Sequence, residues 1–62
     1  MKKYVFKAAN PAYQPNAVIA VTATCLSDAY LLAEEIVGAA LSFEKMFDTT
    51  EKTPKIIENT FE

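Results

Sequence analysis

The residues that could carry chemistry in this 62-residue chain are few, and their spacing assembles none of the usual reactive sets. There is no histidine, so neither a Ser-His nor a Cys-His nucleophile pair can form. Cys25 is the only cysteine, which excludes an intrachain disulfide, and one thiol alone cannot build a zinc site. We expect Cys25 to be a buried structural thiol, with activation by a following helix N-terminus as the alternative.

The carboxylates do not form a catalytic pair either. Glu34 and Glu35 are neighbours in sequence, and on a helix they point about 100° apart. Glu44 and Asp48 are expected to form a solvated acidic edge rather than a metal site. The single glycine cannot make a Gly-rich phosphate loop. The sequence therefore predicts no catalytic, cofactor-binding or metal-binding residue, and we expect a protein that is not an enzyme.

Composition favours one small domain, residues 1–62, whose partner is a protein. A core of this size rarely gives more than about 3–5 kcal/mol, so small domains often add a disulfide, a metal or a second subunit. The basic residues are all lysines and the net charge is −2, and the absence of arginine disfavours nucleic-acid recognition. Lys7 and residues 10–16 interrupt the apolar run that a signal peptide or membrane span requires. A single free cysteine fits a reducing, cytoplasmic location.

Two strands joined by a loop are predicted at the N-terminal end. In residues 2–9, KKYVFKAA, aromatic side chains alternate with lysines at the period of a half-buried strand. Residues 17–25, AVIAVTATC, are rich in β-branched side chains and predict a second strand. The intervening residues 10–16, NPAYQPN, make the pair a hairpin with a long loop. Tyr13 in this loop has two interpretations: its ring caps the end of the sheet, or it projects as a rigid anchor for a partner.

The period changes to that of a helix over residues 27–47. Steps of about 100° place apolar side chains from Ala29 to Phe47 on one face, and Ser27 is a suitable N-cap. The pattern predicts a helix of about 20 residues, roughly 30 Å long. Gly38 in its middle costs roughly 0.5–1 kcal/mol relative to alanine and marks a close packing contact or a break.

A polar connector leads to residues 55–62, KIIENTFE, which we predict as a third strand at a terminus that is free to fray. The fold class is then α+β with the element order β-β-α-β. A right-handed crossover places the third strand beside the first and antiparallel to it, which gives the spatial order 2-1-3. One long helix covers one face of this three-stranded sheet.

Such a helix would carry more apolar surface than one sheet can cover. Its apolar arc spans roughly 220°, whereas a surface helix needs little more than about 100°. Small proteins do expose apolar atoms, but contiguous patches usually mark an interaction site, and a symmetric dimer is the simplest outcome. The candidate interface residues are Tyr13, Tyr30, Leu31, Val37, Leu41, Met46, Val5 and Val18.

Lys2, Lys3 and Lys7 form a small basic strip on the first strand. Solvent-facing lysines that discourage aggregation are the favoured interpretation. Contact with nucleic acid is the alternative, and it requires binding that weakens steeply with salt.

In overall build the chain resembles small accessory proteins of phages and mobile elements, a group that includes anti-CRISPR proteins. The resemblance lies in the short β-β-α-β order, the strand-to-helix junction VTATCLSDA and the missing catalytic set. It implies a phage protein that inhibits a host complex through protein contacts, and it assigns no functional residue.

Three functional hypotheses follow from the sequence. The first is a non-enzymatic protein-binding module, acting as a homodimer and without a membrane, cofactor or small-molecule substrate. The second is a nucleic-acid-associated accessory protein that uses the lysine strip. The third is a structural subunit that assembles through sheet edges.

Overall fold

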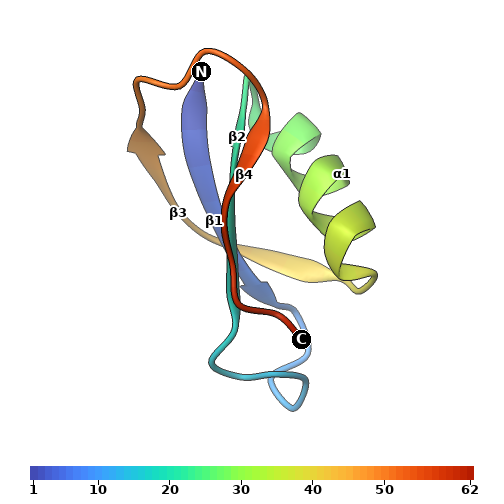
Figure 1. Ribbon diagram of the computed structural model, residues 1–62. Coiled ribbons are helices and arrows are strands. Elements are labelled where there is room, and N and C mark those ends of the chain that lie inside the picture. The colour runs from blue at the N-terminus through green and yellow to red at the C-terminus, as the bar shows by residue number, and fades with distance from the viewer.

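The alternating patterns near the N-terminus form the central hairpin of the sheet, as predicted. In the structure, a computed structural model that describes residues 1–62, the first two strands pair antiparallel from Lys2 opposite Ala23 to Lys7 opposite Val18. The elements in chain order are β1 (Lys2–Ala8), β2 (Val18–Ala23), α1 (Leu26–Val37), β3 (Leu41–Asp48) and β4 (Lys55–Asn59). The fold is therefore α+β, with one helix on one face of an antiparallel sheet (Figure 1).

The helix is shorter than the predicted one, and Gly38 is the reason. Gly38 lies in the left-handed region at φ 75°, and its N–H donates to the carbonyl of Glu34 at 2.8 Å. This is the usual way in which a glycine ends a helix, because other residues strain the backbone there. The prediction of a helix over residues 27–47 is thus wrong beyond Val37.

Residues 41–48 form a strand instead, and this changes the topology. β3 pairs with β1, and β4 pairs with β2, so the sheet has four strands in the order β3-β1-β2-β4. The predicted three-stranded sheet with order 2-1-3 is therefore wrong, because β3 occupies the place beside β1. Residues 49–54 cross the end of the sheet to join the two edge strands (Figure 1).

The start of the helix also differs from the prediction. Cys25, not Ser27, is the N-cap, and its backbone is extended at φ −151°. The Cys25 thiol is exposed, so the expected burial of this residue is wrong. Its Sγ atom lies 3.4 Å from the hydroxyl of Ser27.

The hydrophobic core lies between α1 and the two central strands. Its eight buried residues are Tyr4, Phe6, Ile19, Val21, Ala23, Ala29, Ala33 and Leu41. The two alanines of α1, Ala29 and Ala33, are small, so the helix can approach β2 closely. Phe6 is fully buried, and its ring centroid lies 4.7 Å from that of Tyr30. α1 is not long and apolar enough to span a membrane.

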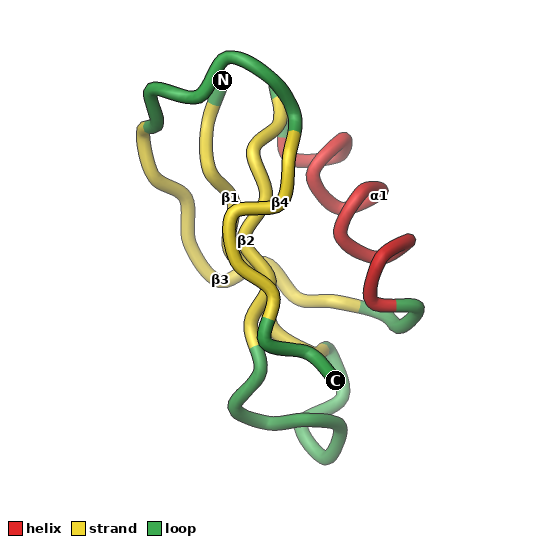
Figure 2. The backbone as a smooth tube through the Cα atoms, in the orientation of Figure 1, coloured by secondary structure: helices red, strands yellow, loops and turns green.

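One helix does not cover a four-stranded sheet. A helix is about 10 Å wide, whereas four strands extend over three spacings of about 4.8 Å plus their own width. The Cα atoms of α1 stay more than 8 Å from those of β4, and Figure 2 shows the helix to one side of the sheet. Apolar side chains on the helix side of both edge strands are therefore left exposed, namely Phe43 and Met46 on β3 and Ile56 on β4.

Candidate functional site

The predicted interface residues divide into exposed and inward-facing groups. Leu31 is 69% exposed on the outer side of α1, Met46 is 50% exposed on β3, and Tyr13 is 37% exposed in the hairpin loop. These three side chains are available to a partner. Val18 is half-buried near the start of β2.

The other predicted interface residues belong to the fold itself. Leu41 and Val5 are buried, and Tyr30 and Val37 pack against the core. The predicted helix over residues 27–47 includes Leu41, whereas in the structure Leu41 is the first residue of β3 and packs in the core with α1. Leu41 and Val5 are therefore covered by the fold itself, whereas Tyr30 and Val37 are partly buried.

Several exposed apolar residues were missed by the sequence analysis because their positions depend on strand register. β3 carries Phe43 and Phe47, which are 41% and 42% exposed, in addition to Met46. Phe43 and Met46 lie on the helix side of the sheet, whereas Phe47 lies on the open face beside Lys3. Ile56 and Ile57 on β4 are 45% and 41% exposed.

The edge of β3 is partly closed by side chains from α1. The backbone N–H of Phe43 donates to the hydroxyl of Tyr30 at 3.0 Å, and the N–H of Leu41 donates to the Glu34 carboxylate at 3.0 Å. These donors would otherwise be unpaired groups that invite another strand. The first half of β3 is thus protected against edge-to-edge pairing, and its side chains are the part left for recognition.

The predicted lysine strip is split between the two faces of the sheet. Lys2 lies on the helix side and forms an ion pair with Asp48. Lys7 lies on the opposite, open face, 3.9 Å from Glu44. Lys3 is also on the open face, with its ammonium 4.8 Å from the centroid of the Phe47 ring. The three lysines therefore do not form one continuous basic patch.

The Lys2–Asp48 ion pair predicts a measurable change in acidity. The hydrogen bond from Lys2 and its positive charge lower the pKa of Asp48 and raise the pKa of Lys2. We expect NMR titration of the Asp48 carboxyl carbon to give a pKa below the ordinary aspartate value. Replacing Lys2→Met should raise it toward that value, and high salt should do the same in the wild-type protein because the pair is exposed.

The sign of the pH effect follows from the lowered pKa. Any stability that this pair contributes is present above the unfolded-state pKa of Asp48 and is lost as the pH falls through the lower folded-state pKa. An Asp48 titration that is identical in the wild-type and Lys2→Met proteins would show that the pair does not form in solution.

The loop of residues 10–16 is tied to the C-terminus. The rings of Tyr13 and Phe61 stack with their centroids 6.3 Å apart, and Phe61 packs against the core. The amide side chain of Gln14 accepts from the N–H of Glu62 at 2.7 Å and donates to the Glu62 carbonyl at 3.2 Å. These contacts favour the core-capping interpretation of Tyr13 while leaving one side of its ring in solvent.

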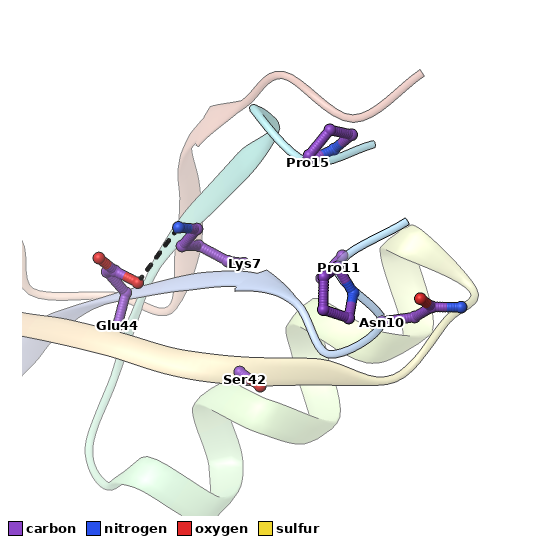
Figure 3. Close-up of a pocket in the computed structure, with 7 residues that line it drawn as sticks. Lys7, Asn10, Pro11, Pro15, Ser42 and Glu44 are labelled. Carbon is purple, nitrogen blue, oxygen red and sulfur yellow. Dashed lines mark ion pairs between the residues drawn. The ribbon is translucent and has the colours of Figure 1, made fainter. Parts of the chain in front are cut away.

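A hollow of about 280 Å³ lies between this loop and the adjoining ends of β1 and β3 (Figure 3). It is lined by Lys7, Ala8, Asn10, Pro11, Pro15, Ser42 and Glu44. Lys7 and Glu44 point toward each other at one end of it (Figure 3). Asn10 accepts a hydrogen bond from the N–H of Ala12 at 3.0 Å. Because its two charged groups, Lys7 and Glu44, face each other, the hollow suits a side chain of a docked protein better than a small charged ligand.

Gln14 allows the stiffness of this loop to be tested. Its backbone is left-handed at φ 44°, a conformation that costs a non-glycine residue roughly 1–2 kcal/mol. We expect Gln14→Ala to lose the two hydrogen bonds to Glu62, to speed hydrogen exchange at the Glu62 amide and to lower stability by about 1 kcal/mol. Gln14→Gly loses the same hydrogen bonds but relieves the backbone strain, so it should be the more stable of the two variants in urea unfolding. Alanine more stable than glycine would contradict the strained conformation.

The arrangement contains no cluster of three or more metal-ligating side chains. It consists of exposed apolar side chains on two edge strands and a loop held in place by the C-terminus. Comparison with protein-family models, with curated proteins and with solved structures finds no match for this chain.

Proposed function

We propose that the protein is a small non-enzymatic protein-binding module that self-associates and contacts a partner protein through apolar side chains. Its mode of action in this proposal is inhibition, in which it occupies a surface that a host protein complex needs. The proposed location is the reducing cytoplasm, where Cys25 stays a free thiol.

The observation that supports the proposal is the apolar surface of β3. Phe43, Met46 and Phe47 are each more than 40% exposed. Scattered apolar atoms are normal on a protein surface, but large neighbouring side chains usually mark a contact site. Phe43 and Met46 are such neighbours on the helix side of β3, and Phe47 extends the apolar edge onto the open face. Aromatic side chains and methionine are also the types enriched in protein interfaces.

The loop of residues 10–16 supports the same function. Its two prolines, the Tyr13–Phe61 stack and the Gln14–Glu62 hydrogen bonds restrict its motion before any partner binds. A loop that is already ordered loses less entropy on binding. The exposed side of the Tyr13 ring and the neighbouring hollow therefore offer a second contact next to the end of the sheet.

The test is affinity capture from the host with matched variants. We expect immobilised wild-type protein to recover a stoichiometric partner, and Met46→Glu/Phe47→Glu to weaken this capture at least tenfold, as for central interface residues. Leu31→Glu places the same charge on the outer side of α1, where we expect no more than a small loss. Recovery of no stoichiometric partner, or equal capture by the wild-type and the double variant, would reject the proposed contact surface.

One observation favours a second function. The ammonium groups of Lys3 and Lys45 lie 4.8 and 5.5 Å from the centroid of the exposed Phe47 ring on the open face of the sheet. Lysines around an aromatic ring on a sheet are the elements of a single-stranded nucleic-acid surface. Binding to an oligonucleotide that falls steeply between 50 and 200 mM salt, and that Lys3→Ala weakens, would support this function, and salt-independent binding would exclude it.

A further inference from the structure

We propose that the self-association occurs through β4, which pairs antiparallel with β4 of a second copy around a two-fold axis. This inference rests on the proposed function, and it specifies which surface two copies share. The two sheets would then join into one continuous sheet of eight strands, with both helices on the same face.

The two edges of the sheet differ in what protects them. On β3, the outward N–H groups of Leu41 and Phe43 are bonded to side chains of α1. The Cα atoms of α1 stay more than 8 Å from those of β4, no hydrogen bond joins the two elements, and every residue of β4 is exposed. β4 also contains no proline, which is one of the usual means of protecting an edge strand. β4 is therefore the open edge of the sheet.

The pairing with β2 determines which backbone groups of β4 are free. The N–H of Thr60 donates to the carbonyl of Val18 at 2.9 Å, and in an antiparallel ladder such bonded pairs alternate with non-bonded pairs. Ile19 opposite Asn59 and Val21 opposite Ile56 are thus the non-bonded pairs. The N–H and C=O groups of Ile56 and Asn59 consequently point away from β2, toward the open edge.

One register of two β4 strands satisfies these free groups. Placing Ile56 opposite Asn59 of the second copy lets each pair exchange two backbone hydrogen bonds, and the two-fold axis repeats the pair. The pairing of β2 with β4 is irregular between Ala20 and Val21, where β4 has one extra residue, Ile57. In the proposed register, Ile57 lies opposite Glu58 of the second copy.

The same register keeps the faces of the two sheets aligned. Ile56 and Asn59 lie on the helix side because their partners on β2 face the core, and Glu58 and Lys55 lie on the open side. Lys55 is then diagonal to Glu58 of the second copy, so opposite charges meet across the junction. This contact would compete with the present ion pair between Lys55 and Glu51 at 2.8 Å.

The joined sheet also covers apolar side chains on the helix side. Tyr30 and Glu34 reach β3, so Leu32 and Ile36, on the opposite flank of α1, face the β4 side. With α1 over β2, the two helices are separated by three strand spacings, about 14 Å, which leaves a gap of about 4 Å between helices about 10 Å wide. The Ile56 side chains of both copies lie under this gap, and Ile36, which is 39% exposed, lines it.

The proposed β4–β4 register predicts an effect of charge at Ile57 that nonspecific apolar contact between two copies does not predict. Sedimentation equilibrium should show that Ile57→Glu raises the dimer dissociation constant at least tenfold, because it places a carboxylate opposite Glu58. Ile57→Lys removes the same apolar side chain but places an ammonium opposite Glu58, so its dissociation constant should stay within about threefold of the wild-type value or fall. Met46→Glu and Met46→Lys are matched controls on the far edge, and both should leave the dissociation constant within about threefold.

Hydrogen exchange followed by NMR gives an independent measurement on the wild-type protein. The amides of Ile56 and Asn59 should become protected as the concentration rises, whereas the amide of Leu31 should not change. If the wild-type protein dimerises but Ile57→Glu and Ile57→Lys weaken the dimer equally, or do not change it, the β4 assignment is overturned while self-association stands. A wild-type protein that stays monomeric at millimolar concentration would overturn both.

Discussion

Phe6→Ala is expected to leave most of the protein unfolded at 25 °C. Phe6 is fully buried and packs against the rings of Tyr30 and Phe43, with centroids 4.7 and 6.1 Å away. Removing a buried phenylalanine ring costs about 3–5 kcal/mol, because the transfer free energy is lost and a cavity is left. A domain of this size is stabilised by only about 3–5 kcal/mol, so the change removes nearly all of it.

The matched variants for Phe6→Ala are Phe6→Leu and Leu31→Ala. Phe6→Leu keeps most of the apolar volume and should retain a cooperative unfolding transition at lower urea concentration. Leu31 is 69% exposed, so Leu31→Ala should change the free energy of unfolding by no more than about 0.5 kcal/mol. Far-ultraviolet circular dichroism at one fixed low concentration is the measurement, since dimerisation adds stability. A folded Phe6→Ala protein with near wild-type stability would show that the core lies elsewhere.

Thr22→Val is expected to destabilise the protein by about 2 kcal/mol and to loosen β4. Thr22 is fully buried on the open face, where its hydroxyl donates to the carbonyl of Thr53 at 2.8 Å and accepts from the N–H of Lys55 at 2.9 Å. Valine has nearly the same shape but leaves both backbone groups without this partner, which costs about 1–3 kcal/mol.

Hydrogen exchange localises the effect of Thr22→Val. Exchange should accelerate at the amides of β4 more than at those of β1, because the hydroxyl fixes the point where the chain enters β4. Thr22→Ser retains the hydroxyl and loses one methyl group, so it should cost only about 1 kcal/mol. Equal destabilisation by valine and serine would mean that the hydrogen bonds contribute little.

The central hairpin could be predicted from the sequence because two independent signals agree there. The alternation in residues 2–9 and the β-branched run in residues 17–25 both indicate strands, and the loop between them contains two prolines. Local preference and tertiary structure coincide at these positions, so β1 and β2 pair as expected.

Residues 41–48 could not be assigned in the same way because two periods fit them. Phe43 and Phe47 are four residues apart, as on one helix face, while Leu41 and Phe43 also alternate with polar residues as in a strand. The irregularity in the β1–β3 register between Val5 and Phe6 shifts this alternation and hides the strand pattern. Gly38 was the informative signal, because a glycine helix terminator predicts the end of α1 at this position.

Of the predicted interface residues, the structure leaves Tyr13, Leu31 and Met46 exposed, and it places Met46 on a strand rather than on a helix. The expected surplus of apolar surface was attributed to one long helix, whereas in the structure it follows from one short helix over four strands. Met46 is exposed for this reason, whereas Leu41 is buried because the start of β3 packs into the core beside α1. The hydrogen bonds of Gln14 to Glu62 join residues far apart in sequence, and no local pattern marks them.

Sedimentation equilibrium of the wild-type protein from micromolar to millimolar concentration tests the central claim most directly. The exposed apolar residues of the edge strands predict a mass that rises from one copy to two and then stays constant. A mass that grows without limit would instead indicate a subunit that assembles through both sheet edges. A mass that remains that of one copy at 1 mM would contradict the account, because the chain would then tolerate its exposed apolar surface without a second copy to cover it.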